Sequence, residues 1–292
     1  MNGVLTKSES ASISIFDHGF LFGDSVYEVV RTIHGRLFAF EPHIERLFES
    51  ALQIGLTLPW SKEELRTEVV QLLEHSALQD EAYVRLIMTR GVGELNIDPS
   101  SCFKPQRILI AKALPRLDPS AYEEGVVLSL VNTKRNSRHA TNPGIKSGNY
   151  LNNVLALIEA RGNKALEAIM LNENGFVTEG TTSNIFLVKD SVILTPSLDC
   201  GLLAGITRKL ILNRARAEGF NVEEGFFKPE DLTSADEAFI TSTTRDVVPV
   251  ARIDDRILDP VPGPMTKKVI ELYRDEVKNY LDKDCPLPHL AE

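Results

Sequence analysis

A lysine at position 146 has the chemical means to react with a carbonyl group. Lys146 lies in the segment Gly144–Tyr150, between a polar loop and the expected start of a helix, close to several small residues. A partly desolvated amine loses its proton more readily and can then attack a carbonyl carbon. Lys146 is therefore a candidate nucleophile for a carbonyl cofactor. The alternative is an ordinary lysine in contact with water.

A carboxylate at position 179 interrupts an apolar region. Glu179 stands in Thr178–Asn184, between two apolar segments that read as strands. A buried carboxylate needs a partner, because leaving it unpaired is costly. A protonated ring nitrogen would be a suitable partner. The alternative is a carboxylate that lies in a turn and contacts water.

Two further segments carry donors that could bind an anion such as a phosphate. Gly205-Ile206-Thr207 opens a predicted helix, where free backbone N–H groups and a hydroxyl favour negative charge. Ser242-Thr243-Thr244 follows a predicted strand, and its hydroxyls could bind phosphate oxygens. Plain helix capping and an ordinary polar turn are the alternatives.

The first part of the chain supplies elements that could position these groups. Residues 13–16 and 20–23 have the look of short strands, and residues 25–33 form a strand that ends in a hairpin turn at His34-Gly35. A helix follows, with Pro42 in its first turn and Gly55 at its end, and a second helix opens on Ser61 and Glu64 in capping-box spacing. Strands are predicted at 82–89 and 107–113.

The second part begins after a proline-containing segment, residues 114–120, which is a candidate linker. We expect strands at 126–132, 237–241 and 247–253, helices at 149–161, 205–219 and 264–281, and a hairpin over 168–188 that turns at Asn174-Gly175. Mixed strands and helices in two blocks indicate an α+β (mixed α/β) protein. The predicted domains are 1–117, the small N-terminal domain, and 118–292, the large cofactor-binding domain.

Composition narrows the classes of partner. The formal charge is −9 and no basic stripe is evident, which argues against nucleic acid. The three cysteines are widely spaced, with no CxxC or Cys/His cluster, so neither a disulfide framework nor a metal site is expected. No apolar run is long enough to cross a membrane, and no secretory leader is evident. We therefore expect a cytoplasmic protein.

The order of these features resembles the fold-type IV enzymes that use pyridoxal 5′-phosphate (PLP): branched-chain aminotransferases, D-amino-acid aminotransferases and aminodeoxychorismate lyase. The resemblance extends from about residue 13 to 266. Its most specific motifs are Phe20–Asp24, His43–Leu47, Ile145–Ser147, Thr178–Gly180 with Asn184–Phe186, and Gly205–Arg208. It implies a small N-terminal α/β domain, a larger β-barrel-like domain with helices, and a homodimer whose site borrows residues from the second subunit.

The resemblance also implies residue roles. Lys146 would form the Schiff base and then move the proton, as base and acid. Glu179 would pair with the pyridine nitrogen, and Tyr150 would hydrogen-bond the cofactor's O3′. Leu203 would pack against one face of the ring. The cofactor's phosphate would be held by Arg46, Ile206, Thr207, Ser242 and Thr243.

Substrate choice is read from positions where members of this group differ. D-amino-acid enzymes carry an Arg and a His in the loop that here spans residues 90–99, where this chain has Leu95 and Ile97. Branched-chain enzymes use a Tyr-x-Arg strand, matched here by Tyr83-Val84-Arg85, whose period of two puts both side chains on one face. The expected substrate-binding residues are Tyr27, Arg31, Tyr83, Arg85 and Thr244. They favour an L-branched-chain amino acid with 2-oxoglutarate as acceptor.

Two departures leave alternatives open. Val29 stands where the branched-chain group usually has Gly, and Ser242-Thr243-Thr244 replaces a Gly-Thr-Ala turn. Arg245, which follows, is either a surface charge or a second cation for a dicarboxylate. A D-amino-acid aminotransferase, an aminodeoxychorismate-lyase-like enzyme and a catalytically silent binding protein are the alternative functions.

Overall fold

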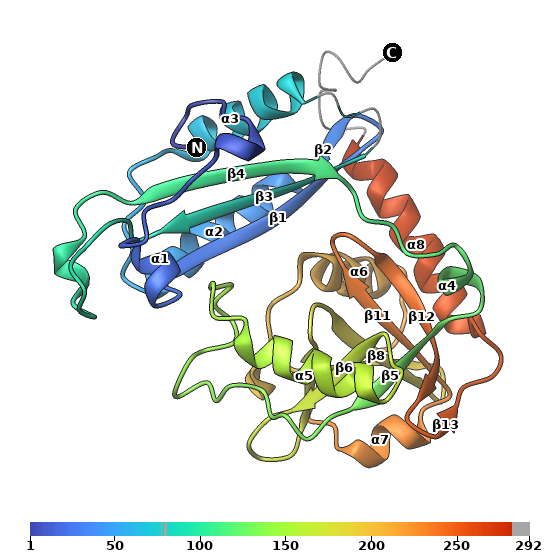
Figure 1. Cartoon of the computed structure of the whole chain (residues 1–292). Helices are drawn as coiled ribbons and strands as arrows, with labels where there is room; N and C mark the ends of the chain where they lie inside the picture. The colour runs from blue at the N-terminus through green and yellow to red at the C-terminus, as the bar shows by residue number, and fades with distance from the viewer. Residues whose placement is uncertain (77, 79–80, 282–292) are drawn as a thin grey trace. The chain divides into compact units, whose positions relative to one another are not determined.

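The computed structural model describes residues 1–76, 78 and 81–281, and it mixes helices and strands as expected (Figure 1). The chain forms two compact units. Among the described residues, unit 1 comprises the chain up to Pro115, the segment Ile145–Asn149 and residues 280–281, and unit 2 comprises Arg116–Gly144 and Tyr150–Asn279. The division into domains 1–117 and 118–292 stays a prediction.

Unit 1 is built on a four-stranded antiparallel sheet. The turn between its first two strands has positive φ at His34 (47°) and Gly35 (69°), as a tight two-residue hairpin requires. The strand order is β2-β1-β3-β4. The strands are β1 (Ser25–Ile33), β2 (Arg36–Phe38), β3 (Ala82–Thr89) and β4 (Gln106–Ala113).

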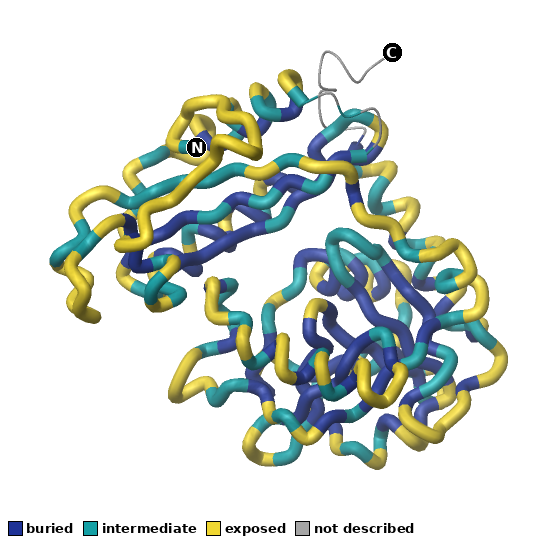
Figure 2. Tube along the Cα trace, viewed as in Figure 1, coloured by how far each residue is buried: buried dark blue, intermediate teal, exposed yellow. Residues whose placement is uncertain are grey.

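One face of this sheet packs against helix α2 (Phe40–Gln53), and Figure 2 shows the buried stretch that results. Val30 and Val84 on the strands meet Ile44 and Leu47 on the helix, all four fully or almost fully buried. Helix α3 (Lys62–His75) begins with the predicted capping box, in which the Ser61 hydroxyl accepts from the Glu64 N–H and the Glu64 carboxylate accepts from the Ser61 N–H. The alternate residues of β1 and β3, Tyr27 and Arg85 among them, lie on the other face of the sheet.

A segment distant in sequence pairs with the free edge of β1. The Tyr27 N–H donates to the Lys146 carbonyl (2.9 Å), and the Gly148 N–H donates to the Ser25 carbonyl (2.8 Å). A Cβ at Gly148 would lie 2.2 Å from the Ser25 hydroxyl oxygen, so the close approach requires glycine here. The backbone of Lys146 is therefore held by the sheet of unit 1, although Lys146 falls within the second of the two predicted domains.

The start of the chain differs from expectation. Residues 13–16 form no strand, and residues 20–23 include the end of a short helix, α1 (His18–Leu21). The Asp17 carboxylate accepts from the Gly19 N–H (2.8 Å) and caps this helix. Ile13, Ile15 and Phe16 are exposed, so the apolar residues that suggested a buried strand face outward. A 3₁₀ turn (Ser8–Ser10) precedes this region and another (Pro99–Ser101) precedes β4.

Unit 2 contains a nine-stranded sheet in the order β10-β9-β8-β11-β12-β5-β6-β7, with β13 paired to β12. Its strands are β5 (Val126–Leu130), β6 (Glu167–Leu171), β7 (Val177–Gly180), β8 (Asn184–Lys189), β9 (Val192–Pro196), β10 (Val222–Gly225), β11 (Glu237–Ser242), β12 (Asp246–Ile253) and β13 (Arg256–Ile257). Its helices are α4 (Ser120–Glu123), α5 (Leu151–Gly162), α6 (Ile206–Ala217), α7 (Pro229–Ser234) and α8 (Pro264–Leu281), the last two residues of which belong to unit 1, and a 3₁₀ turn spans Leu198–Cys200.

This sheet curls, so that β7, at one end of the strand order, lies near β8 in its middle. Leu128, Ile185, Ile240 and Val248 are buried together in the core that the curled sheet encloses. The predicted hairpin over 168–188 is correct only in its first half. Strands β6 and β7 pair and turn near Gly175, whereas β8 pairs with β9 and β11.

Candidate active site

Lys146 lies beside an aromatic ring in unit 1. Its N–H donates to the Ser50 hydroxyl (3.2 Å), and its Nζ is 4.6 Å from the centroid of the Tyr27 ring. Tyr27 itself is buried, and the guanidinium carbon of Arg85 lies 3.9 Å from the centroid of the same ring. Two cationic side chains therefore adjoin one tyrosine.

The strand register gathers the predicted substrate residues of unit 1 on one face of the sheet. Val29 lies opposite Arg85, and Arg31 lies opposite Tyr83. Directly opposite residues of an antiparallel pair project to the same side, and so do residues two apart, so Tyr27 shares that side. The Arg85 Nε is buried and has no hydrogen-bond partner among the described residues. The face presents cationic donors to an anion.

A buried charge cluster that the sequence reasoning missed lies on the opposite side of β1. The Glu28 carboxylate accepts from the Arg46 Nε (2.6 Å), and its other oxygen is 2.7 Å from His43 Nδ1. Burial alone would raise the pKa of Glu28, but Arg46 and His43 outweigh it and hold that pKa well below its usual range. Burial lowers the pKa of His43, outweighing the nearby Glu28 carboxylate. The cluster holds the predicted phosphate residue Arg46 in one orientation.

In unit 2, the Glu179 carboxylate is buried and held at both oxygens. Oε1 accepts from the Arg135 Nε (2.9 Å), and Oε2 accepts from the Leu203 N–H (3.1 Å) and the Asn184 amide (3.4 Å). Glu179 is thus not the solvent-exposed turn carboxylate that was the alternative. Asn184 falls in a motif already noted, whereas Arg135 lies in a polar segment without periodicity, and no signal in the sequence pointed to it.

The other predicted cofactor residues of unit 2 occupy the ends of elements. Tyr150 immediately precedes α5, and Leu203, whose carbonyl accepts from the Asn184 amide (3.0 Å), precedes α6. Ile206 and Thr207 form the buried first turn of α6. The N-cap residue of that turn, Gly205, has no side chain that could cap it, which suits the turn's N–H groups to bind an anion.

Gly205 is required by its neighbour. A Cβ at this position would lie 1.9 Å from the Asn184 Oδ1. The start of α6 therefore packs directly against the asparagine that also contacts Glu179. This contact links the geometry of the helix start to that of the carboxylate.

Arg245, whose role was open, is committed to a buried carboxylate. Its guanidinium contacts Glu167 (2.7 Å), donates to the Thr182 hydroxyl (2.7 Å) and donates through Nε to the Ser242 hydroxyl (3.2 Å). Glu167 also accepts from the Thr182 N–H (2.7 Å). Arg245 is thus not a plain surface charge. It ties the Ser242–Thr244 turn to the turn that follows Glu179.

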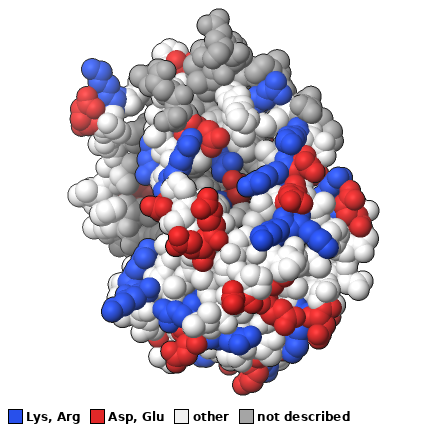
Figure 3. Space-filling view, turned by 90° about the vertical axis from the view of Figure 1, so that its right-hand side faces the viewer, with Lys and Arg blue, Asp and Glu red and all other residues white. Residues whose placement is uncertain are grey.

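Three further observations concern the described part of the chain. None of its helices has the length and apolarity needed to cross a membrane, and no group of three His, Cys, Asp or Glu residues within it could bind a metal ion. Acidic and basic side chains are interspersed over the face shown in Figure 3.

Comparison with known families decides the class of protein. Residues 25–253 match the family described as amino-transferase class IV, a range that covers most of the chain and all of the predicted site residues, from Tyr27 to Thr244. The chain belongs to the class IV aminotransferase family.

Individual relatives cover nearly the whole chain. A protein of Methanocaldococcus jannaschii with a provisional branched-chain-amino-acid aminotransferase name is 41% identical over 276 residues, 94% of each chain. The D-alanine aminotransferase of Listeria monocytogenes is 38% identical over 281 residues, 95% of each chain. The crystal structure of the branched-chain aminotransferase of Thermoproteus uzoniensis with norvaline matches with a TM-score of 0.90 at 31% identity, over 98% of this chain and 97% of that one.

These matches confirm three expectations. The fold is the fold-type IV arrangement of mixed helices and strands with a curled sheet, the protein is an aminotransferase, and its cofactor is pyridoxal 5′-phosphate, on which class IV aminotransferases depend. Branched-chain and D-alanine enzymes both occur among the relatives, so class membership alone does not choose the substrate.

Proposed function

We propose that this aminotransferase moves the amino group between an L-branched-chain amino acid and 2-oxoglutarate. The observation that carries the proposal is the sheet face with Tyr27, Arg31, Tyr83 and Arg85. On this face Arg85 lies against the Tyr27 ring, and its buried Nε has no hydrogen-bond partner in the part of the chain that the structure describes. A guanidinium so placed suits the substrate's α-carboxylate, because Arg binds carboxylates through charge-assisted hydrogen bonds.

The loop after β3 offers no competing carboxylate site of the D-amino-acid kind. Arg90 is engaged with the Asp24 carboxylate (2.8 and 3.0 Å) and with two backbone carbonyls, at Ile54 and Gly55. Leu95 and Ile97, at the positions where the D-amino-acid enzymes carry cations, are exposed apolar side chains. This difference favours the L-amino-acid reading over the D-amino-acid alternative.

The residues present fit the cofactor in chemical kind. An amine at Lys146, a held carboxylate at Glu179 and an uncapped helix start at Ile206 and Thr207 are what a carbonyl, a ring nitrogen and a phosphate require. Bound PLP supplies an aldehyde that receives the amino group and a ring that accepts electrons.

The remaining roles complete the proposal. Lys146 Nζ would take the proton from the amino acid's Cα and later return it, while the Glu179 carboxylate would accept the hydrogen bond of the ring N–H. The donor leaves as a branched-chain 2-oxo acid, and 2-oxoglutarate leaves as glutamate, so one amino group is exchanged for one carbonyl oxygen. Tyr150 binds O3′, Leu203 packs against the ring, Arg46, Ser242 and Thr243 join the phosphate donors, and Thr244 contacts the substrate.

We infer that the enzyme is a homodimer. Helix α5 carries Leu151, Val154, Leu155 and Ile158 with 69%, 48%, 50% and 64% of their surface exposed, and their spacing puts all four on one side of the helix. A monomer gains nothing from such an apolar stripe in water, whereas a second copy could cover it.

The assembly is tested by light scattering coupled to size exclusion. We expect wild type at twice the chain mass of 32.4 kDa and Leu155→Glu at the mass of a monomer. Lys268→Glu, which reverses the charge of an exposed residue of helix α8, is the control. A wild-type monomer with full activity would refute the inference.

A cytoplasmic location also belongs to the proposal. Cys102 and Cys200 carry free thiols, which suits a reducing compartment. Burial raises the pKa of the Cys200 thiol, so this sulfur stays protonated and inert near neutral pH.

The deciding experiment is a panel of half-reactions. The PLP form is mixed with L-leucine, L-valine, L-isoleucine, D-alanine and D-leucine, and the conversion of the aldehyde to the amine form is followed by absorbance. We expect conversion by the three L-amino acids and regeneration of the aldehyde form by 2-oxoglutarate. Faster conversion by D-alanine would overturn the proposal in favour of a D-amino-acid enzyme. Pyruvate release from an aminated chorismate would indicate the lyase, and no conversion by any amino acid would indicate the silent binding protein.

A further inference from the structure

The partner of Glu179 is a buried arginine outside the motifs of the family resemblance. Arg135 and Glu179 have only 8% and 7% of their side-chain surface exposed, and their Nε and Oε1 are 2.9 Å apart. An ion pair removed from water is strong only when its geometry is good and its other polar atoms are satisfied. The surroundings of Arg135 meet both conditions.

Helix α5 and strand β6 hold Arg135 in place. Its Nη1 donates to the Asn152 Oδ1 (3.1 Å) and, at a longer distance of 3.4 Å, to the Asn153 Oδ1, and its backbone N–H donates to the Leu171 carbonyl (2.8 Å). The Asn153 amide in turn donates to the Thr181 carbonyl (2.7 Å), in the turn just after Glu179. The arginine and the turn are therefore fixed by the same helix.

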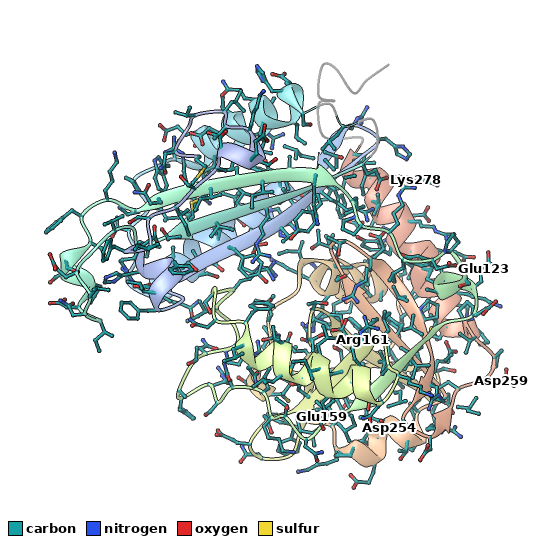
Figure 4. All side chains as sticks on the ribbon, viewed as in Figure 1. Glu123, Glu159, Arg161, Asp254, Asp259 and Lys278 are labelled. Carbon is teal, nitrogen blue, oxygen red and sulfur yellow. The ribbon has the colours of Figure 1, made fainter. Side chains whose placement is uncertain are left out.

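The loop that delivers Arg135 is anchored two residues earlier. The Glu159 carboxylate of α5, labelled in Figure 4, accepts from the Asn132 N–H (2.6 Å) and amide (2.9 Å) and from the Thr133 hydroxyl (3.1 Å). Burial alone would raise the pKa of Glu159, but these hydrogen-bond donors outweigh burial and hold that pKa below its usual value. The group therefore stays a carboxylate near neutral pH. Positioning of Arg135 thus also involves the segment just before it.

We propose that Arg135 is a positioning residue that keeps Glu179 in its carboxylate form and fixes the orientation in which this carboxylate meets the cofactor's ring nitrogen. The inference rests on the proposed role of Glu179. Arg135 holds Oε1, and the Leu203 N–H and the Asn184 amide hold Oε2, so the orientation of the carboxylate is set at both oxygens. The nearby guanidinium favours the charged form of a carboxylate that burial would otherwise drive toward the neutral acid.

The proposal makes Glu179 dependent on Arg135 for its charge. Without the guanidinium, Glu179 would remain buried and would take up a proton at a higher pH. A neutral acid cannot hold a proton on the ring nitrogen, so the amino-transfer rate would fall at a pH where the wild type is fully active. An effect of Arg135 on packing alone would lower the rate equally at every pH.

Arg135→Gln tests this dependence. We expect its acid limb in the pH profile of the half-reaction to move to higher pH, its rate at the optimum to fall about 100-fold, as for a misplaced catalytic group, and its PLP dissociation constant to rise. Arg135→Lys, which keeps the charge, restores the acid limb in part and remains informative if the glutamine variant folds poorly. Arg138→Gln removes the same charge from an exposed pair with Asp199 and is expected to behave as wild type.

A double-mutant cycle with Glu179→Gln separates this inference from the proposed function. If Arg135 acts through Glu179, Arg135→Gln adds little to the defect of Glu179→Gln in rate, acid limb or PLP affinity. An unmoved acid limb in both Arg135 variants, or an undiminished effect of Arg135→Gln in the Glu179→Gln background, overturns the inference. A Glu179→Gln enzyme with wild-type half-reactions would instead refute the proposed role of Glu179 itself.

Discussion

Glu28 and Arg46 form a two-point ion pair, with the Arg46 Nε 2.6 Å from Oε1 and Nη2 3.0 Å from Oε2. Glu28 follows Tyr27 in strand β1, so the two side chains project to opposite sides of the sheet. The strand thus carries a proposed substrate residue on one side and the anchor of a proposed phosphate residue on the other. A change at either position tests one side of the sheet.

We expect Glu28→Gln to destabilise the protein by about 3–5 kcal/mol, since it leaves a buried guanidinium without its countercharge. The lowered pKa of Glu28 gives this contribution a sign in pH. The contribution is complete above the unfolded value near 4.5 and is lost as the pH falls toward the folded value. Urea unfolding of both proteins between pH 3 and 8 should show a constant gap above about pH 5 that narrows in acid.

Glu41→Gln is the matched control for this change. Glu41 pairs with Arg66, but it has 54% of its side chain exposed, and such pairs contribute at most about 1 kcal/mol. Equal destabilisation by the two substitutions, or a gap for Glu28→Gln that persists unchanged to pH 3, would contradict the assignment of a buried ion pair.

His43 should lower stability on the acid side. Its pKa is lowered by burial, so the folded state keeps it neutral while the unfolded chain takes up a proton below its usual value of 6.5. Stability therefore falls as the pH drops below 6.5, and the loss reaches about 1.4 kcal/mol per pH unit for one group. His43→Gln should flatten this part of the pH dependence between 5 and 6.5, whereas exposed His75→Gln should leave it unchanged. A slope that survives in His43→Gln would assign it to other groups.

Sequence reasoning found the elements whose signals are local. Ser61 and Glu64 predicted the start of α3, and His34-Gly35 predicted the turn between β1 and β2, because a cap and a tight turn are each determined by a few adjacent residues. Strands β9 and β10 and helix α7 were missed. They are short, and their pairing is decided by distant parts of the sheet.

The candidate site shows the same division. Lys146 and Glu179 stood in recognisable motifs, but their partners did not. Ser50 and Arg135 contact them from other elements, 96 and 44 residues away in sequence. Nothing in the local pattern around Arg135 distinguishes it from a solvated arginine. Long-range partners of this kind emerge only when the chain is folded.

Gly205→Ala should weaken cofactor binding and stability together. Its Cβ would lie 1.9 Å from the Asn184 Oδ1, so the start of α6 or the Asn184 side chain must shift, and overpacking of this kind costs about 1–3 kcal/mol. We expect a higher PLP dissociation constant, measured by absorbance titration, and a lower unfolding free energy. In Gly162→Ala the new Cβ would meet no atom within 4 Å, so this variant should neither raise the PLP dissociation constant nor lower the unfolding free energy. If the PLP affinity of Gly205→Ala were unaltered, the proposal that the first turn of α6 binds the cofactor's phosphate would be contradicted.

Lys146→Ala should abolish covalent attachment of the cofactor. After borohydride reduction of the wild type, mass spectrometry of peptides should find the cofactor on Lys146, since a reducible link requires the amine. Lys268→Ala, which removes an exposed lysine from α8, should label like the wild type. The amino-transfer rate of Lys146→Ala should fall by at least about 100-fold, the lower range for a general acid–base. Label on a different lysine in the wild type would refute the assignment.

Arg85→Met tests the substrate face directly. Removing a charge-assisted hydrogen bond to the α-carboxylate, which contributes about 1.5–3 kcal/mol, should raise KM for L-leucine and for 2-oxoglutarate by about 10- to 100-fold. PLP affinity should stay close to that of the wild type, because Arg85 is not among the proposed cofactor residues. Lys104→Met removes an exposed cation from the same unit and should leave both KM values unchanged. If KM for both substrates is unaltered in Arg85→Met, the α-carboxylate binds elsewhere. The sheet face around Arg85 would then no longer support an L-branched-chain substrate.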